Sequence, residues 1–304
     1  MSERTLKGLV GALAVALGLW LVVTFVSGGS GSIAAPGDVA GFFDGADQDA
    51  IRAVRIATPD ASVELERVDE GWSVSGFPAD SAAVTRLLDA IERASIGELV
   101  AANPDNHERM GVSTDSTTTI EIDVEGVVRE LYIGDAGPRF GTAFVRRPGD
   151  DEVYLLEGDL KAQMGRDIDQ WRDRTMVAID SSAVTRIEVQ RPGDDYTLVR
   201  GDSAWALESG AEAATTAVDG LLAELARLVA SGFVADTDSI ASLGTGSTTR
   251  AYDAAGTVLA EITIGQGETD RWARTASAPY LYRVSAFRAD RVAPPRERVE
   301  GGGS

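Results

Sequence analysis

The sequence repeats one pattern of short strands and a helix, and this repetition limits the folds that the chain can adopt. Each copy opens with three segments that alternate between apolar and polar residues or begin with tryptophan: 53–56, 62–68 and 72–74 in the first copy, and 184–189, 196–199 and 205–207 in the second. Alternation with a period of two residues, bounded by turn residues, is typical of short antiparallel strands. Trp72 and Trp205 stand at matching places.

A helical segment follows in each copy. Four apolar residues recur at the spacing i, i+3, i+4 and i+7: Val84, Leu87, Leu88 and Ile91 in the first copy, and Val218, Leu221, Leu222 and Leu225 in the second. This spacing places the four side chains on one helical face. Asp80 or Ser81 is expected to cap the first helix, and Thr215 or Thr216 the second, by accepting a hydrogen bond from a free N–H group.

Four more strands complete each copy. They are expected at 118–124, 129–134, 143–146 and 153–155 in the first copy, and at 249–252, 259–265, 271–274 and 281–283 in the second. The sequence therefore predicts an α+β fold with two related, mainly antiparallel units, each with one main amphipathic helix. We also expect a short helix over 159–174, between the units. The predicted boundaries are an anchor at 1–26, a flexible linker at 27–48, units at 49–175 and 176–293, and a flexible tail at 294–304.

An unbroken apolar run begins the chain. Arg4 and Lys7 precede it, and it extends from Leu9 to Val26 without a charge. About 20 such residues can cross a bilayer as a helix. The residues predicted to form the membrane anchor include Leu9, Leu13, Leu17, Trp20, Val23 and Val26.

The position of the basic residues predicts the orientation of this helix. Because both precede the apolar run, the N-terminus is expected to stay in the cytoplasm. The chain would then be a single-pass protein of the inner membrane, with its body in the periplasm or another extracytoplasmic space. A cleavable signal peptide is the alternative, but its apolar core is usually only about 7–15 residues long. We expect an uncleaved anchor.

Composition and motifs argue against several classes of activity. The net charge of −20 repels nucleic acid, and the absence of cysteine excludes thiolate catalysis and thiolate metal sites. His107 is the only histidine, and no Gly-x-Ser-x-Gly elbow occurs. The glycines of 134–141 lie between two strands, which favours a hairpin loop over a phosphate-binding loop. We therefore expect no enzyme activity, cofactor or metal, although two carboxylates that met in a pocket would suit a hydrolase.

A partner or ligand surface is expected in the second part of each unit. Arg146 and Arg274 occupy equivalent places in the repeat, and three aromatic residues lie near Arg274 in the sequence: Trp272, Tyr280 and Tyr282. If exposed, these side chains suit a sugar or peptide partner. If buried, they are ordinary residues of a sheet.

Several motifs together resemble a bacterial family, that of domain of unknown function 4340. They are Gly71-Trp-Ser-Val74 with the helix after it, Met110-Gly-Val112, Leu131-Tyr-Ile-Gly134 with the two strands after it, and Trp171-Arg-Asp-Arg174. The resemblance covers roughly residues 50–290 together with the anchor.

The resemblance implies an extracytoplasmic protein tethered to the membrane. It implies an accessory role beside a membrane complex such as an ABC-type transporter, and it carries over no catalytic residue. Together with the anchor, the repeated body and the lack of a catalytic motif, this predicts a non-enzymatic accessory or scaffold protein. A module that binds an envelope glycan or peptide is the alternative, and a carboxylate-based hydrolase is a third hypothesis.

Overall fold

The computed structural model describes residues 41–69, 71–234, 246–265 and 270–300. These residues form two compact units, which divide between Trp171 and Arg172. The predicted anchor at 1–26, with all the residues named for it, lies outside the described ranges. Within those ranges, no helix has the length and apolar character that a membrane crossing requires.

The first unit contains a nine-stranded antiparallel sheet. Its strands are β1 (Ile51–Ala57), β2 (Ser62–Val68), β3 (Gly71–Val74), β4 (Phe77–Pro78), β5 (Ser95–Ala101), β6 (Thr118–Val124), β7 (Val127–Ala136), β8 (Thr142–Arg146) and β9 (Val153–Glu157). Their order in space is β4-β3-β2-β1-β6-β7-β8-β9-β5. Six pairs of neighbouring strands are consecutive in the sequence and are joined by short turns. β5 instead follows a helix and forms one end of the sheet.

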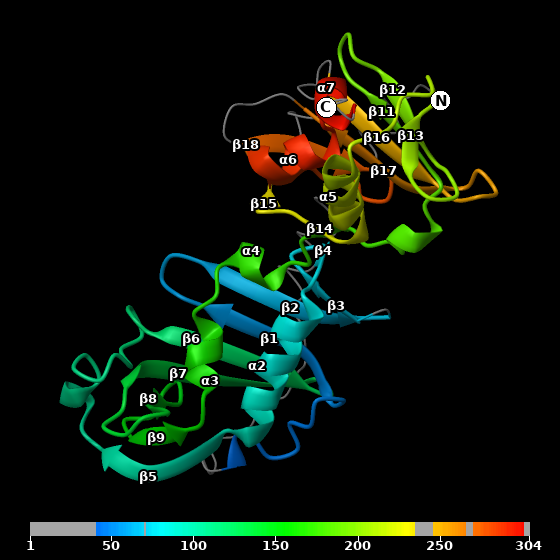
Figure 1. The fold of residues 1–304 in the computed structure, drawn as a ribbon. Helices are drawn as coiled ribbons and strands as arrows, with labels where there is room; N and C mark the ends of the chain where they lie inside the picture. Colours follow the sequence, from blue (N-terminus) through cyan, green and yellow to red (C-terminus); the bar gives the residue numbers. More distant parts are fainter. Residues whose placement is uncertain (1–40, 70, 235–245, 266–269, 301–304) are drawn as a thin grey trace, which may run out of the picture. The chain divides into compact units, whose positions relative to one another are not determined.

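Helices cover one face of this sheet. They are α2 (Ser81–Arg93), α3 (Leu160–Met164) and α4 (Ile168–Trp171), and a 3-10 turn, η2 (Pro104–Asn106), lies between β5 and β6. Figure 1 shows α2 and α3 lying across the sheet. All four apolar residues predicted for the inner face of α2 are buried. Asp80 caps α2, because its carboxylate accepts a hydrogen bond of 2.7 Å from the backbone N–H of Ala83.

The second unit contains an eight-stranded sheet and a separate strand pair. Its elements are β10 (Thr175–Val177), η3 (Ser181–Ala183), β11 (Arg186–Gln190), β12 (Tyr196–Arg200), β13 (Trp205–Leu207), α5 (Thr215–Ala226), β14 (Leu228–Val229), β15 (Gly232–Phe233), β16 (Ser247–Tyr252), β17 (Val258–Ile264), β18 (Asp270–Thr275), β19 (Tyr282–Ser285), α6 (Ala286–Val292) and α7 (Arg296–Val299). The sheet order is β13-β12-β11-β16-β17-β18-β19-β15, and β10 pairs with β14.

One strand order therefore occurs in both sheets. The order β3-β2-β1-β6-β7-β8-β9-β5 of the first unit corresponds position by position to the complete sheet of the second. Side chains recur with it. The guanidinium of Arg67 lies 5.3 Å from the ring of Trp72 on the neighbouring strand, and that of Arg200 lies 5.1 Å from the ring of Trp205.

A hydrogen bond at the start of the main helix also recurs. The N–H of Asp80 donates to the carbonyl of Trp171 over 2.7 Å, and the N–H of Ala214 donates to the carbonyl of Val299 over 2.7 Å. Each bond ties the helix start to the last helix of its unit.

The helix predicted over 159–174 is wrong as a single element. It forms two short helices, α3 and α4, which are separated around Gly165. Glycine lowers helix propensity, and here it stands at the C-cap of α3.

The cap predicted for the second helix is also wrong. The N-cap residue is Ala214, which offers no side-chain acceptor, so Thr215 and Thr216 fall inside α5.

The ends of the described chain differ from the flexible segments expected there. Phe42, within the expected linker, is buried in the core of the first unit. Val299, within the expected tail, is buried at the end of α7. Both residues are apolar and remove their side chains from water by packing on a unit.

Candidate partner-binding surface

The two arginines predicted for a partner surface occupy equivalent places in the two sheets. Arg146 follows Val145, which pairs with Ile133. In the same way, Arg274 follows Ala273, which pairs with Ile264. Each of these isoleucines precedes a glycine. Their surroundings differ, however. Arg146 belongs to the first unit and is buried, whereas Arg274 belongs to the second and is exposed.

Arg146 holds a loop onto the first sheet. It is only 5% exposed. Its Nη2 and Nε donate to the carbonyl of Val112 over 2.8 and 3.0 Å, and its Nη1 donates to the carbonyl of Asp150 over 3.0 Å. The guanidinium also lies 4.9 Å from the ring of Tyr132. The side chain of Arg146 therefore stabilises the first unit internally and does not form part of a partner-binding surface.

Two of the other predicted residues meet at a cavity of the second unit. Arg274 and Tyr280 line a space of about 290 Å³ together with Glu261 and Thr263. Ala276, Ala278, Pro279 and Leu281 add apolar surface to its lining, and such a mixed lining suits a sugar or peptide ligand.

The remaining two aromatic residues serve the packing of the second unit. Tyr282 is buried against the rings of Phe233 and Tyr280, at centroid distances of 5.3 and 5.2 Å. Burial raises the pKa of Tyr282 well above its usual range. Trp272 is half-buried on β18, opposite Arg283 of β19.

Apolar side chains are exposed at the β5 edge of the first unit. Leu99 is 53% exposed and Val100 is 39% exposed. The register of β5 on β9 shifts on both sides of Leu99, so its side chains do not alternate regularly between the two faces of the sheet. Phe140, in the loop between β7 and β8, is fully exposed at 107%. We call Leu99, Val100 and Phe140 the edge surface.

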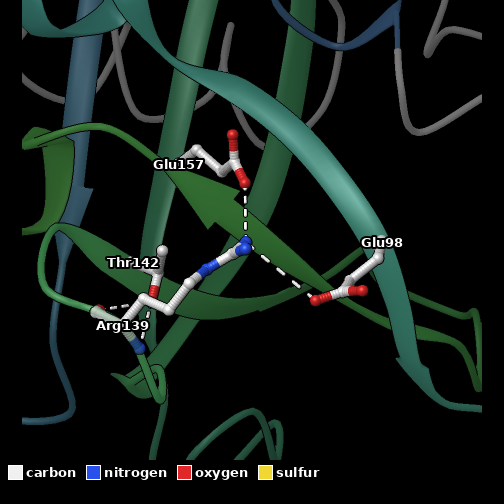
Figure 2. Close-up of polar contacts among 4 residues, drawn as sticks. All are labelled: Glu98, Arg139, Thr142 and Glu157. Atoms are coloured by element: carbon white, nitrogen blue, oxygen red, sulfur yellow. Dashed lines mark hydrogen bonds and ion pairs between the residues drawn. The ribbon is translucent and has the colours of Figure 1, made fainter.

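A polar network joins the Phe140 loop to β5 (Figure 2). Arg139 extends from the loop, and its Nη2 lies 2.8 Å from Oε1 of Glu157 and 4.0 Å from Oε1 of Glu98. Thr142 closes the base of the loop by donating from Oγ1 to the carbonyl of Arg139 over 2.6 Å. The network thus connects β5, β9 and the residue next to Phe140.

The loop also has a steric reason for its shape. A side chain at Gly137 would lie 2.4 Å from Oγ1 of Thr142, and Gly141 adopts a φ of +73°. Only glycine accepts both conditions without strain. This segment joins β7 to β8, as the hairpin interpretation predicted.

Sequence reasoning missed the edge surface. The sequence pattern predicts no strand over 95–101, and it places Phe140 in a hairpin loop. The available signal was a phenylalanine between Pro138 and Gly141, since an aromatic residue in so tight a turn has little apolar surface to cover it.

The groups considered for catalysis are engaged in local structure. Nε2 of His107 lies 2.9 Å from the carbonyl of Asp151. Among the described residues, no group of three or more histidines and acids has a geometry suited to a metal ion.

Acidic residues do line a second cavity of the second unit. Glu188, Asp195 and Glu208 line a space of about 420 Å³. Glu188 accepts a hydrogen bond of 2.7 Å from the hydroxyl of Tyr252, and Asp195 accepts one of 2.8 Å from the N–H of Arg191. Two of the three acids thus have structural partners.

Comparison with known proteins places this fold in a family. The model of one family, described as a domain of unknown function (DUF4340), matches residues 72–247. The match begins at Trp72 on β3 and ends at the start of β16, so it includes parts of both units. No curated protein and no solved structure matches the chain. Because the match covers more than half of the sequence, the chain belongs to the DUF4340 family.

Proposed function

We propose that this protein is a non-enzymatic accessory or scaffold protein, anchored in the inner membrane, whose extracytoplasmic body binds a membrane complex such as an ABC-type transporter. The observation that carries the proposal is the edge surface of the first unit. The apolar run at 1–26 supports the anchor, because its length suits a bilayer.

The edge surface has the features of a protein-binding site. β5 has a neighbour on one side only and carries the exposed side chains of Leu99 and Val100, so a partner at this end of the sheet would cover apolar surface. Phe140 supplies an aromatic anchor of the kind that dominates interface energies. The ion pair of Arg139 with Glu157 steadies the loop from which that anchor projects.

The first experiment is co-purification of the full-length protein from membranes in mild detergent, after chemical crosslinking. We expect a membrane-protein partner, and Phe140→Ser should reduce its recovery at least about tenfold, because an interface anchor is worth about 2 kcal/mol or more. Val258→Ser is the matched control, since Val258 is also a large exposed apolar residue but lies on the second unit. A protein that is recovered alone, or a partner retained equally by both variants, contradicts the proposal.

A second experiment tests the anchor and the orientation. Deletion of residues 2–26 should release the protein from the membrane fraction. Alkaline phosphatase fused to the C-terminus should be active, because that enzyme folds only after export. An inactive fusion would place the body in the cytoplasm.

The cavity of Arg274 and Tyr280 favours one alternative, a module that binds an envelope glycan or peptide. In that case Tyr280→Ala should abolish binding to isolated cell-wall fragments, whereas Phe140→Ser should leave it unchanged. The two variants therefore separate the two functions.

A further inference from the structure

A mainly apolar cavity of the second unit lies beside α5 and α6. Its volume is about 450 Å³, within the range of small-molecule sites. Ala214, Ala217 and Gly220 line it from the α5 side, and Phe287 and Pro294 from the α6 side. None of these five residues has a polar side chain, whereas Thr216, Asp290, Arg291 and Arg298 complete the lining. This combination favours a ligand that has an alkyl chain and a charged end over a wholly polar one.

Phe287 leaves part of its ring in water. It is 69% exposed, although it borders the cavity. The guanidinium of Arg291 lies 5.5 Å from this ring. A ligand that entered the cavity would cover apolar surface of Phe287 that water now contacts, which favours binding by about 25 cal/mol for each Å² removed from water.

The charged residues around the cavity are unevenly matched. Arg298 borders it and has no ion pair among the described residues. Nε of Arg291 lies 3.7 Å from the carboxylate of Glu224, which also pairs with Arg288 at 3.3 Å, and Nη2 of Arg291 donates to the carbonyl of Gly220 over 3.4 Å. The one acid in the wall, Asp290, is paired with Arg271 at 2.8 Å. A positive rim on a chain of net charge −20 is suited to an anionic group.

The first unit differs at the corresponding place. Counted from the two N-cap residues, Gly220 of α5 corresponds to Arg86 of α2. The hydrogen bond at the helix start aligns Val299 with Trp171, which is fully buried. Gly220 gives room to Arg291, whose guanidinium lies 3.4 Å from the place of a Cβ at Gly220, whereas α2 carries the side chain of Arg86 at that position.

We propose that this cavity binds a free single-chain anionic amphiphile of the fatty-acid type. The alkyl chain lies against Ala217 and Phe287, and the carboxylate lies at the rim beside Arg298 and Arg291. Arginine suits this role, because its planar guanidinium can donate two parallel hydrogen bonds to one carboxylate. The site is separate from the edge surface, which belongs to the first unit.

The test uses the full-length chain reconstituted in lipid nanodiscs. The probe is decanoate with a photoreactive diazirine near the end of its alkyl chain, and peptide mass spectrometry locates the label after illumination. We expect labelling within 214–220 and 286–298. Excess decanoate should suppress this labelling, whereas excess butyrate, which has the carboxylate without the chain, should not.

Variants separate the two parts of the site. Ala217→Leu places a larger side chain in the cavity and should reduce labelling at least about tenfold, a change of about 1.4 kcal/mol in binding. The matched control is Ala223→Leu, which adds the same side chain at an exposed position of α5 and should label like the wild type. Arg298→Gln should weaken labelling by decanoate but not labelling by the equivalent diazirine-bearing decanol.

Four results would overturn the proposal. The first is no label at these two segments, and the second is unchanged labelling of Ala217→Leu whose circular dichroism shows a folded protein. The third is a dimer, detected by light scattering, that Phe287→Ser dissociates, because a second copy would then cover the cavity. The fourth is equal labelling by decanol and decanoate, because the site would then not select an anionic ligand. Each of these outcomes is independent of co-purification through Phe140.

Discussion

The two units have the same strand order but differ in one row of charges across their sheets. In the first unit, Arg55, Glu121 and Glu130 lie side by side on β1, β6 and β7. The corresponding row of the second unit, on β11, β16 and β17, is Glu188, Arg250 and Glu261. Charge alternates along the second row but not along the first, where two glutamates are neighbours. The order of the strands is therefore independent of these surface pairs and depends on turns and apolar alternation.

The units also differ in how they fill the space at the start of the main helix. Trp171 and Val299 accept equivalent hydrogen bonds from the helix start. Trp171 is 0% exposed and is among the largest fully buried side chains of the first unit. Val299 is also buried but much smaller, and residues of the helix that it contacts, α5, line a cavity. One shared backbone contact thus supports two cores of different size.

The largest expected change in stability comes from removing the side chain of Trp171. Trp171→Ala should lower the free energy of unfolding of the first unit by about 3–5 kcal/mol, because it removes a buried aromatic residue and leaves a cavity. Val299→Ala should cost the second unit only about 1.6 kcal/mol, the value of two methylene-sized groups. Hydrogen exchange followed by mass spectrometry measures each unit by its own peptides.

A conservative variant serves as the control for this comparison. Nε1 of Trp171 has no hydrogen-bond partner among the described residues. Trp171→Phe should therefore retain most of the stability that Trp171→Ala loses. Equal losses in Trp171→Ala and Val299→Ala would show that the two positions are not different in packing.

A smaller effect is expected at the helix caps. Asp80 caps α2 with its side chain, whereas Ala214 at the equivalent place offers none. Asp80→Ala should cost about 1 kcal/mol, and Ala214→Asp should add stability of about the same size to the second unit. Exchange of the amides in the first turn of each helix is the measurement. A loss of protection in Ala214→Asp would contradict the equivalence of the two positions.

The sequence predicted those parts of the fold that depend on local patterns. Alternation located β2 and β6, the apolar spacing located α2, and Asp80 is one of the two residues, with Ser81, that the sequence predicts as its cap. It did not predict β5, because the register of this strand shifts twice and its partner, β9, is distant in the chain. Periodicity cannot reveal a strand whose side chains do not alternate.

The predicted surface failed in part for a different reason. Arg146 and Arg274 are equivalent in register, but the burial of Arg146 depends on the carbonyl of Val112, which a loop brings to it. A residue type in a strand does not indicate what a distant loop will place over it. Tyr280 and Arg274 do share a cavity, because β18 and the segment before β19 are neighbours.

The smallest effect concerns the two neighbouring glutamates. Burial raises the pKa of Glu130 above its usual value of 4.5, and the charge of Glu121 raises it further, while Arg55 lowers it. The folded state thus binds this proton more tightly than the unfolded state. The contribution of Glu130 to stability is therefore full below the usual pKa of a glutamate, and it is lost as the pH rises through the raised pKa of the folded state. Glu130→Gln should remove that loss.

The expected gain in Glu130→Gln is about 0.5 kcal/mol at neutral pH, the size of a like-charge pair across two strands, and it should disappear below about pH 4. In the second unit, the matching substitution is expected to change stability in the opposite direction. Glu261 pairs with Arg250 over 2.7 Å, so Glu261→Gln should lower stability at neutral pH by about 0.5 kcal/mol. Urea unfolding of both variants between pH 4 and pH 8 measures the two signs. If both substitutions changed stability in the same direction, the charge rows would not explain the difference between the units.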